Sequence, residues 1–370
     1  MATFLPLSLC PLYLMTKTLF MNSRTVLSAV FIFLVTSVFA QRPDMSLIPY
    51  RKGDVWGYAS PDKQIVIAPM YNETDLFYEG YGLVKKADRY GYINKAGKMI
   101  IPAKFYSAKH FRFGYFDNPA KHKTDTVLYA GAALRTDGYE RCFNTKGVQM
   151  AKCPAINENI QPPNPIVETV SEKVYSNVKA NGDIYDKIVD DYKLGTDNDD
   201  NYYIATKNGI YGVFNNKFEV VVPFNNQSIK KIMINGKNYL LVQKDGMYGI
   251  LNSYGVAIVP VDNNNVQYVR TVDGKDYFFI TKDGGTMVED GEMKNIFKGN
   301  YTNVSYETEG GFIVTGANQL KGYYFLNTGM VINPKYTDVK SVRGGDYVWV
   351  TTQAGKHGFI NSRGIEFFEE

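Results

Sequence analysis

Residues 244–260 read KDGMYGILNSYGVAIVP, and the order of residue types in this stretch recurs along the chain. It consists of a Gly turn, an aromatic–Gly pair, an apolar pair, Asn-x-x-Gly and an aliphatic run closed by Pro. Self-similarity at a fixed period indicates a repeat architecture and outweighs any single local motif.

Eight copies of this unit can be traced, five of them clearly. The clear copies contain the pairs Trp56-Gly57, Tyr90-Gly91, Tyr211-Gly212, Tyr248-Gly249 and His357-Gly358. Weaker copies lie at 141–147, 282–288 and 323–334, and these three are read as lacking the Gly. Gly91 follows Gly57 by 34 residues and Gly249 follows Gly212 by 37, so one unit is about 36 residues long.

The turn residues predict four strands per unit. Asn at the first and Gly at the fourth position are typical of a type I turn. This pattern pairs Asn94 with Gly97, Asn144 with Gly147, Asn252 with Gly255, and Asn361 with Gly364. The dipeptides Asn208-Gly209, Asp245-Gly246 and Asp283-Gly284 predict hairpins of type I′, and Asn235-Gly236 and Asp273-Gly274 mark further hairpins upstream. The Pro that closes each unit is expected to end the fourth strand, because it cannot donate to a ladder.

These units predict an all-β chain of tandem four-stranded sheets. The content of Tyr (29), Phe (22) and Gly (33) agrees with strands and tight turns. One such sheet cannot bury both faces alone, so neighbours must stack on each other. We expect a propeller-like ring of seven or eight sheets, with an open β superhelix as the alternative. The first unit has no obvious first strand before Ser46.

The repeated units resemble the WG repeat, also called the KWG repeat. The resemblance rests on VWGYAS, YGYINKAGKMIIP, YGVFN, YGILNSYGVAIVP and HGFINSRG, and it extends over most of residues 46–370. Only Trp56-Gly57 keeps the literal Trp-Gly pair. The resemblance implies a β-rich repeat protein, usually bacterial and often exported, with interaction roles and no catalytic residues.

The array is expected to be interrupted once. We predict a leader at 1–40, repeats one to three at 41–150, an insertion at 151–200 and repeats four to eight at 201–370. The insertion contains the stiff segment QPPNP at 161–165. It ends in DNDDN at 197–201, which imitates a calcium loop, but Tyr202 and Asn208 occupy the positions of its required Gly and Glu.

The N-terminal segment predicts export. Val26–Ala40 is an apolar run of about 15 residues preceded by Arg24, which fits a signal peptide cleaved after Ala40 and is shorter than a membrane span. Met21 would give an ordinary leader, with Met1 and Met15 as alternative starts. The mature chain is expected in the periplasm, in the outer envelope or outside the cell.

Two cysteines, Cys142 and Cys153, remain after the leader. An exported protein permits a disulfide between them, and two free buried thiols are the alternative. The spacing matches no zinc motif.

No catalytic, cofactor or metal site is predicted. The three histidines, His110, His122 and His357, are scattered, and the glycines fall in repeat turns instead of nucleotide loops. A pair of carboxylates brought together only by folding, as in glycosidases, stays open. We therefore predict a chain that is not an enzyme.

A module that binds a protein or peptide, or that serves as a scaffold, is the leading function, and binding of carbohydrate, less so its hydrolysis, is the alternative. From Gln41 onward the net charge is +4 − 2 = +2, which does not favour a nucleic-acid partner. The stretch RFGYF at 112–116, with Lys104, Lys109, Lys121, His122 and Lys123 nearby, could form an anion-binding patch or simply a solvated hairpin. No stable insertion of the mature chain into a membrane is expected.

Overall fold

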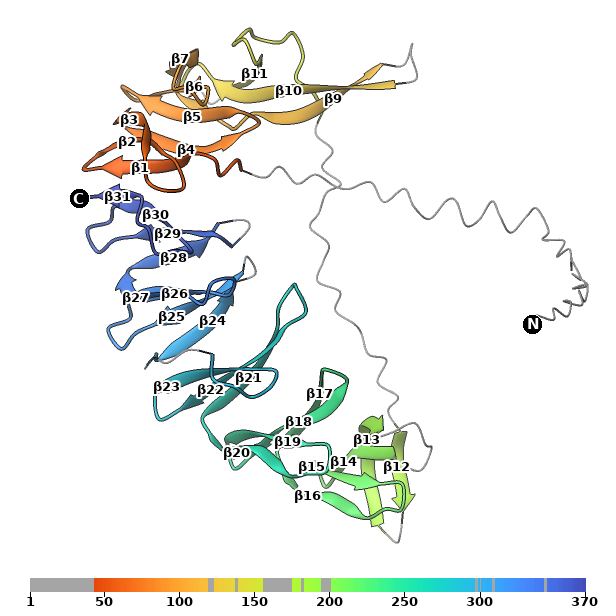
Figure 1. Cartoon of the computed structure of the whole chain (residues 1–370). Coiled ribbons are helices and arrows are strands. Elements are labelled where there is room, and N and C mark those ends of the chain that lie inside the picture. Colours follow the sequence, from red (N-terminus) through yellow and green to blue (C-terminus); the bar gives the residue numbers. More distant parts are fainter. Residues whose placement is uncertain are drawn as a thin grey trace, which may run out of the picture. The chain divides into compact units, whose positions relative to one another are not determined.

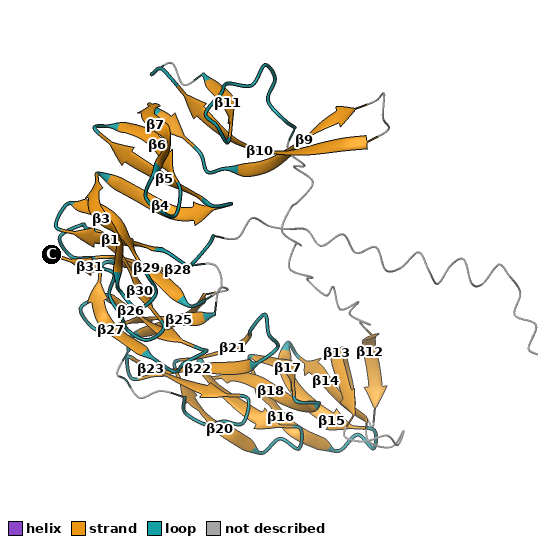
Figure 2. Ribbon diagram, turned by 45° about the horizontal axis from the view of Figure 1, so that its top comes forward, coloured by secondary structure: helices purple, strands orange, loops and turns teal. Residues whose placement is uncertain are grey.

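The computed structural model describes residues 43–118, 123–136, 139–155, 175–180, 183–193, 201–296, 299, 301–307, 310–342 and 345–370. The leader, its cleavage point after Ala40 and most of the 197–201 loop lie outside these residues. Every regular element within them is a strand, as Figure 2 shows. Over the same residues no helix reaches the length and hydrophobicity that crossing a bilayer requires.

The described strands form eight sheets, and Figure 1 labels the strands where there is room. The first three sheets in the chain hold the following strands. The β1 sheet has β1 (Ile48–Lys52), β2 (Val55–Ala59) and β3 (Ile65–Tyr71); the β4 sheet has β4 (Glu73–Tyr78), β5 (Tyr81–Lys86), β6 (Arg89–Ile93) and β7 (Met99–Phe105); the β8 sheet has β8 (Ser107–Ala108), β9 (Arg112–Asn118), β10 (Lys123–Ala133) and β11 (Glu140–Asn144).

The other five sheets follow in the same way. The β12 sheet has β12 (Tyr175–Ala180), β13 (Asp183–Lys193), β14 (Asn201–Lys207), β15 (Ile210–Asn215) and β16 (Val220–Asn226), and the β17 sheet has β17 (Ser228–Ile234), β18 (Lys237–Lys244), β19 (Met247–Asn252) and β20 (Ala257–Asn263). The β21 sheet has β21 (Asn265–Arg270), β22 (Asp276–Lys282) and β23 (Gly285–Asp290). The β24 sheet has β24 (Asn303–Glu307), β25 (Gly311–Thr315), β26 (Lys321–Phe325) and β27 (Val331–Tyr336), and the β28 sheet has β28 (Asp338–Ser341), β29 (Tyr347–Thr351) and β30 (His357–Asn361). The last strand, β31 (Phe368–Glu369), joins the β1 sheet.

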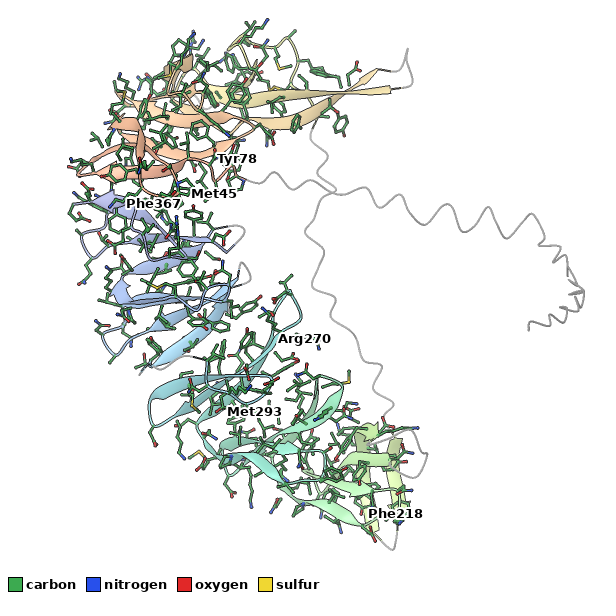
Figure 3. All side chains as sticks on the ribbon, in the orientation of Figure 1. Met45, Tyr78, Phe218, Arg270, Met293 and Phe367 are labelled. Carbon is green, nitrogen blue, oxygen red and sulfur yellow. A yellow bond between two sulfur atoms is a disulfide. The ribbon has the colours of Figure 1, made fainter. Side chains whose placement is uncertain are left out.

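Neighbouring sheets are held together by shared apolar cores, because alternate residues of each strand point to opposite faces. Leu83 and Tyr92 of the β4 sheet, for example, pack against Phe111 and Phe143 of the next unit. Shared cores of this kind join seven pairs of sheets in the described part of the chain. Figure 3 shows side chains filling these layers. The predicted all-β array of small stacked sheets, of the kind found in propellers, is confirmed.

The repeat Gly lies where the outermost strand of a sheet crosses the strand before it. A Cβ on Gly57 would lie 2.2 Å from the carbonyl oxygen of Ile67, and one on Gly249 would lie 2.7 Å from that of Val259. Both contacts are with backbone, which cannot rotate away. The outer strands are bulged at this point, and the close approach explains why these copies require Gly. At Gly212 and Gly358 a Cβ would instead meet the ring of Phe224 (2.6 Å) or Phe368 (2.1 Å).

Two sequence predictions about this unit are wrong. The closing Pro does not end the fourth strand: β3 continues past Pro69 to Tyr71, and β20 continues past Pro260 to Asn263. Pro is tolerated because the strand is at the edge of its sheet, where no neighbour needs the missing N–H. The seventh copy also keeps its Gly, at Gly322, where a Cβ would meet the backbone of β27 at 2.1 Å.

The Asn-x-x-Gly turns share one hydrogen-bond pattern. The N–H of Gly97 donates to the carbonyl of Asn94 at 2.9 Å, and the N–H of Gly255 donates to the carbonyl of Asn252 at 3.0 Å. The same bond, at 2.9 Å, closes the turns that end at Gly147 and at Gly364. All four are turns of the predicted kind.

The glycines of these turns differ from the prediction in one respect, because a type I turn by itself does not need Gly at its fourth position. The φ angles of Gly97, Gly255 and Gly364 are 77°, 80° and 79°, in the left-handed region that a residue with a Cβ rarely adopts. A type I turn followed by a left-handed residue is the three-residue hairpin loop with a bulge. The chain therefore needs Gly for its backbone angle.

The same three glycines also touch the preceding repeat unit, which the sequence did not predict. A Cβ added to any of them would crowd that unit, so the turn lies close against its neighbour. The nearest atoms would be Ile67 Cγ1 at 3.3 Å for Gly97, Val221 O at 2.7 Å for Gly255 and Met330 Cε at 2.5 Å for Gly364. These glycines therefore allow the backbone to turn and also let the turn pack against the preceding unit.

The predicted two-residue hairpins are mostly confirmed. Both residues have positive φ in Asn208-Gly209, Asn235-Gly236, Asp245-Gly246 and Asp283-Gly284, as a type I′ turn requires. At Asp273-Gly274 only Gly274 has positive φ. Its N–H donates to the carbonyl of Thr271 at 2.9 Å, so this loop is of the bulged kind described above.

The missing first strand of the first unit is supplied by the end of the array. β31 pairs in parallel with β1, with Arg51 opposite Phe368. The Arg51 side chain is buried and donates to the carbonyls of His357 (2.7 Å) and Gly53 (2.6 Å) and to Glu370 Oε1 (3.0 Å). We call this arrangement of β1, β31 and Arg51 the terminal clasp.

The segment predicted as an insertion at 151–200 contributes strands to the array. β12 and β13 lie within it and complete one sheet with β14, β15 and β16. Aromatic residues of this segment form part of the core, since Tyr185 packs on Phe214 and Tyr192 on Tyr202. The described part of residues 175–200 is therefore repeat, and the remaining residues of the segment are outside the description apart from 151–155.

Candidate functional site

A polar pocket lies between the β4 sheet and the strand that enters the β8 sheet. We call it the β4–β8 pocket, and its volume is about 410 Å³. Its wall is formed by Glu73, Thr74 and Asp75 from β4, Leu83 and Lys85 from β5, Tyr90 from β6, and Ala108, Lys109 and His110 from β8 and the residues after it. Several polar groups that converge on one cavity favour a small-molecule site over a simple packing defect.

Three side chains of the wall form one row across the sheet. Register places Glu73 opposite Lys85 and Lys85 opposite Tyr90, so all three point to the same face. Lys85 Nζ lies 2.7 Å from Glu73 Oε1, and the Tyr90 hydroxyl donates to Glu73 Oε2 at 3.0 Å. The hydrogen bond to Glu73 raises the pKa of Lys85, and burial followed by the same carboxylate raises the pKa of Tyr90.

The second carboxylate of the wall faces His110. The Nε2 of His110 lies 3.1 Å from Asp75 Oδ2, and the imidazole ring packs against Tyr78 at 4.1 Å between centroids. Asp75 Oδ1 accepts a hydrogen bond from the Leu76 N–H at 2.7 Å. Nδ1 of His110 is buried and has no hydrogen-bond partner among the described residues. Because a carboxylate oxygen can only accept, Nε2 is the donor in its contact with Asp75.

Two further hollows lie between the β17 and β21 sheets. The first, which we call the β17–β21 groove, has a volume of about 340 Å³ and is lined by Lys230, Ile232, Leu241, Asn265, Val266, Gln267 and Tyr268. The second, the acidic hollow, includes Lys275, Asp276, Asp290 and Glu292 in its wall and has a volume of about 280 Å³. The Tyr268 hydroxyl donates to buried Asp276 at 2.6 Å and thereby connects the two. Burial and this hydrogen bond raise the pKa of Tyr268 to about 12.

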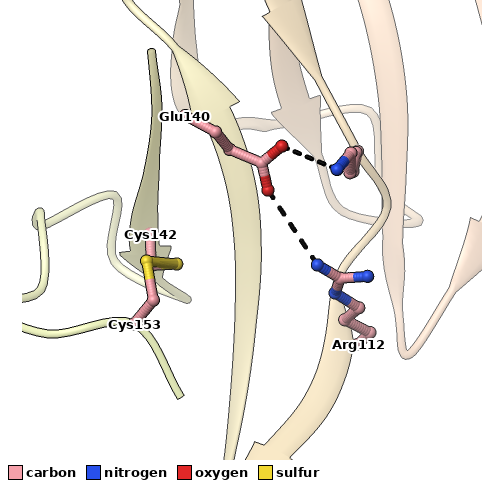
Figure 4. Close-up of a disulfide and its surroundings, with 5 residues drawn as sticks. Arg112, Glu140, Cys142 and Cys153 are labelled. Atoms are coloured by element: carbon pink, nitrogen blue, oxygen red, sulfur yellow. Dashed lines mark ion pairs between the residues drawn. A yellow bond between two sulfur atoms is a disulfide. The ribbon is translucent and has the colours of Figure 1, made fainter. Parts of the chain in front are cut away.

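Two cations of the basic stretch around β9 share one carboxylate of the protein. Glu140 bonds Lys109 at 2.6 Å and lies 3.9 Å from Arg112, the two ion pairs drawn in Figure 4. The Lys104 ammonium lies over the ring of Phe105 at 5.3 Å. These pairings favour the solvated hairpin over an anion-binding patch. Lys121 and His122 lie outside the described residues, as does the side chain of Lys123.

A disulfide closes the end of the β8 sheet. The Sγ atoms of Cys142 and Cys153 are bonded (2.06 Å), as Figure 4 shows. Ala155, two residues further along the chain, exchanges two backbone hydrogen bonds with Tyr115 of β9. The disulfide thus anchors a segment that covers β9.

The aromatic repeat positions serve packing between sheets or, at His357, within one sheet. Trp56 stacks on Trp349 of the β28 sheet at 6.0 Å, and His357 stacks on Trp349 at 5.2 Å within that sheet. Tyr211 and Tyr248 pack at the edges of two shared cores. Of these repeat aromatics Tyr90 also lines the β4–β8 pocket. Among the described residues, no group of three His, Cys, Asp or Glu is arranged to hold a metal ion.

Sequence reasoning did not identify Glu73, Asp75 or Lys85, and it treated His110 as isolated. The alternation of Glu73 and Asp75 was visible, but the pairing of Glu73 with Lys85 depends on a bulge between Thr74 and Phe77. That bulge shifts the register of the hairpin, and no residue type in the sequence marks it.

Comparison with known proteins supports the repeat assignment. The family model described as "WG containing repeat" matches residues 56–90 and 90–116. A comparison with curated proteins gives no significant match.

Several solved structures resemble the chain weakly. A structure titled "Crystal structure of the eukaryotic initiation factor" has a TM-score of 0.31 and 12% identity, covering 88% of this chain and 96% of that chain. "Structure of Dos1 propeller" has a TM-score of 0.24 and 11% identity, covering 90% and 98%. Hsv2 of Kluyveromyces lactis has a TM-score of 0.24 and 9% identity, covering 78% and 93%. Similarity at this level carries no functional inference.

Proposed function

This chain is a WG-repeat protein, and from that premise we propose that it is an exported, non-catalytic module that binds a peptide segment of a partner protein. The observation that carries the proposal is the β17–β21 groove. Its floor is apolar, with Ile232 and Val266 buried, and its rim carries the amides of Asn265 and Gln267. Amide side chains can bond a peptide backbone while the apolar floor accepts a side chain.

Charge indicates which peptide would fit. The acidic hollow next to the groove contains Asp276, Asp290 and Glu292, of which Glu292 is paired with Lys294 at 2.6 Å and Asp276 lies 3.9 Å from Arg270. Lys275 in the same wall is paired with Asp273 at 3.1 Å. A peptide with an apolar residue in the groove and a basic residue in the acidic hollow would match both surfaces.

Two features support export. The apolar run Val26–Ala40 has the length and the flanking residues of a signal peptide. Disulfides such as Cys142–Cys153 persist in oxidising compartments and are rare in the cytosol. Processing after Ala40 would release the mature chain to the periplasm, to the outer envelope or to the medium.

The proposal of a non-catalytic role draws on the β4–β8 pocket. Glu73 is engaged by Lys85 and Tyr90, and Asp75 is engaged by His110 and Leu76. We assign these carboxylates to recognition, because each already accepts a hydrogen bond from a protein donor that fixes its orientation in the wall.

A peptide-display selection on the mature chain from Gln41 tests the proposal. We expect enriched peptides with a basic residue near an apolar one, and we expect the variant Gln267→Arg to weaken their binding at least about tenfold by filling the groove. Ser305→Arg is the matched control, because Ser305 has the same exposed position on β24 that Gln267 has on β21. The absence of any enriched peptide, or equal binding by both variants, would contradict the proposed function.

A further inference from the structure

We propose that the β4–β8 pocket binds an uncharged, hydroxyl-rich ligand, one or more sugar units of a neutral oligosaccharide. This inference goes beyond peptide binding and concerns a different interface of the array. It rests on the charge balance of the wall, on its remaining hydrogen-bond capacity and on the mixture of polar and apolar groups around one cavity.

Charge balance disfavours an ionic ligand. The wall has two carboxylates, Glu73 and Asp75, and two ammonium groups, Lys85 and Lys109. Each of the four has a protein partner, since Lys109 bonds Glu140 at 2.6 Å and the other three are paired as described above. An anion or a cation would have to break one of these pairs, whereas a neutral ligand leaves all of them in place.

The wall nevertheless keeps free hydrogen-bonding capacity. Each oxygen of Glu73 accepts one bond, from Lys85 or from Tyr90, and a carboxylate oxygen has a second lone pair. Lys85 has three N–H donors. Because its ammonium lies 2.7 Å from the Glu73 oxygen, an acceptor and a donor stand side by side. A hydroxyl group both donates and accepts, so adjacent hydroxyls of a sugar match this arrangement.

Size and apolar surface fit the same ligand class. A volume of about 410 Å³ is within the range of small-molecule sites. Leu83 and the half-buried ring of Tyr90 contribute carbon surface next to the charged row. Aromatic rings with a polar end suit ligands that have both C–H faces and hydroxyl edges, as sugars do.

An array of neutral and acidic oligosaccharides tests the proposal on the mature chain. We expect neutral glycans to bind and charged ones, such as digalacturonate, to bind more weakly. Titration calorimetry with the strongest neutral glycan should show at least about a tenfold loss of affinity in Glu73→Gln and in Lys85→Met. These variants alter one exposed ion pair, so melting temperatures close to wild type will show that the fold is kept.

The matched control is Asp262→Asn, which removes an exposed carboxylate bonded to Lys282 at 2.6 Å on other sheets and should leave glycan binding unchanged. The proposal is overturned if no neutral glycan binds the wild-type chain, if acidic glycans bind more tightly, or if Glu73→Gln binds as the wild type does. Peptide binding at the β17–β21 groove is measured on the same variants and should not change, so failure of one proposal is distinguishable from failure of the other.

Discussion

Adding a single methyl group at Gly249 should separate two strands of the β17 sheet. A Cβ at this position would lie 2.7 Å from Val259 O, 2.8 Å from Pro260 O and 2.8 Å from the Cα of Val261. Nonbonded heavy atoms pack best at about 3.5–4.0 Å, so β20 would have to move by roughly 1 Å. That movement would strain the bulged ladder between β19 and β20.

The expected cost combines two opposing effects. Overpacking a well-packed site costs about 1–3 kcal/mol, and replacing Gly by Ala returns about 0.4–1 kcal/mol by restricting the unfolded chain. We therefore expect Gly249→Ala to lower the free energy of unfolding by about 1–2 kcal/mol, and Gly249→Val by more. Ala257→Val is the control, because Ala257 is an exposed residue of the same outer strand.

Urea unfolding followed by circular dichroism would measure the difference. The same reasoning predicts a rank order, since a Cβ would lie closer to backbone at Gly57 (2.2 Å) and Gly322 (2.1 Å) than at Gly91 (2.8 Å). Alanine should thus be more costly at the first two positions than at the third or at Gly249. Unchanged stability of Gly249→Ala and Gly57→Ala, within about 0.5 kcal/mol, would refute the steric explanation of the repeat Gly.

Three further perturbations test other parts of the array. Arg51→Met should lower the free energy of unfolding by about 2–3 kcal/mol, because it removes a buried guanidinium together with its three hydrogen bonds. A loss under about 0.5 kcal/mol in urea unfolding would contradict this role of Arg51. The Tyr268 phenol, with its pKa raised to about 12, contributes stability that is complete below about pH 10 and is lost as pH rises from there to about 12. Tyr268→Phe should therefore show a smaller loss of stability over this range, and parallel pH profiles would argue against the assignment. Replacing Cys142 and Cys153 together by Ser should cost about 3 kcal/mol for a loop of this length, and identical thermal melts of the variant and the oxidised wild type would exclude a stabilising disulfide.

Much of the fold was predictable because its determinants are local. The Asn-x-x-Gly turns and the Asn-Gly hairpins fix strand ends within a few residues, and their spacing fixes the repeat. Alternation of apolar residues then assigns the buried faces. The resemblance to WG repeats predicted the repeat fold but no functional site, because the motif residues Trp56, Gly57 and their equivalents serve packing.

The wrong or missing predictions concern contacts that no short segment of the sequence encodes. Pro69 and Pro260 were expected to end strands because the sequence does not show that their strands lie at a sheet edge. The turn glycines were assigned to their turns, and their contact with the preceding unit follows only from how the sheets stack. The partner of β1 could not be predicted, since β31 comes from the other end of the array and contributes only two residues. The β4–β8 pocket depends on a register shift in β4 and on where His110 lies after β8, and both follow from tertiary packing.

The terminal clasp has a consequence for how the chain is made. About 300 residues separate β1 from β31, and at roughly 5–20 residues per second a ribosome needs about 15–60 s to synthesise them. Throughout that time the first sheet is one strand short, with an unpaired edge that other chains can recognise. A truncated product that lacks Phe368 and Glu369 would keep this edge permanently. Pairing with β31 therefore covers the edge of the first sheet only in a chain that contains both strands.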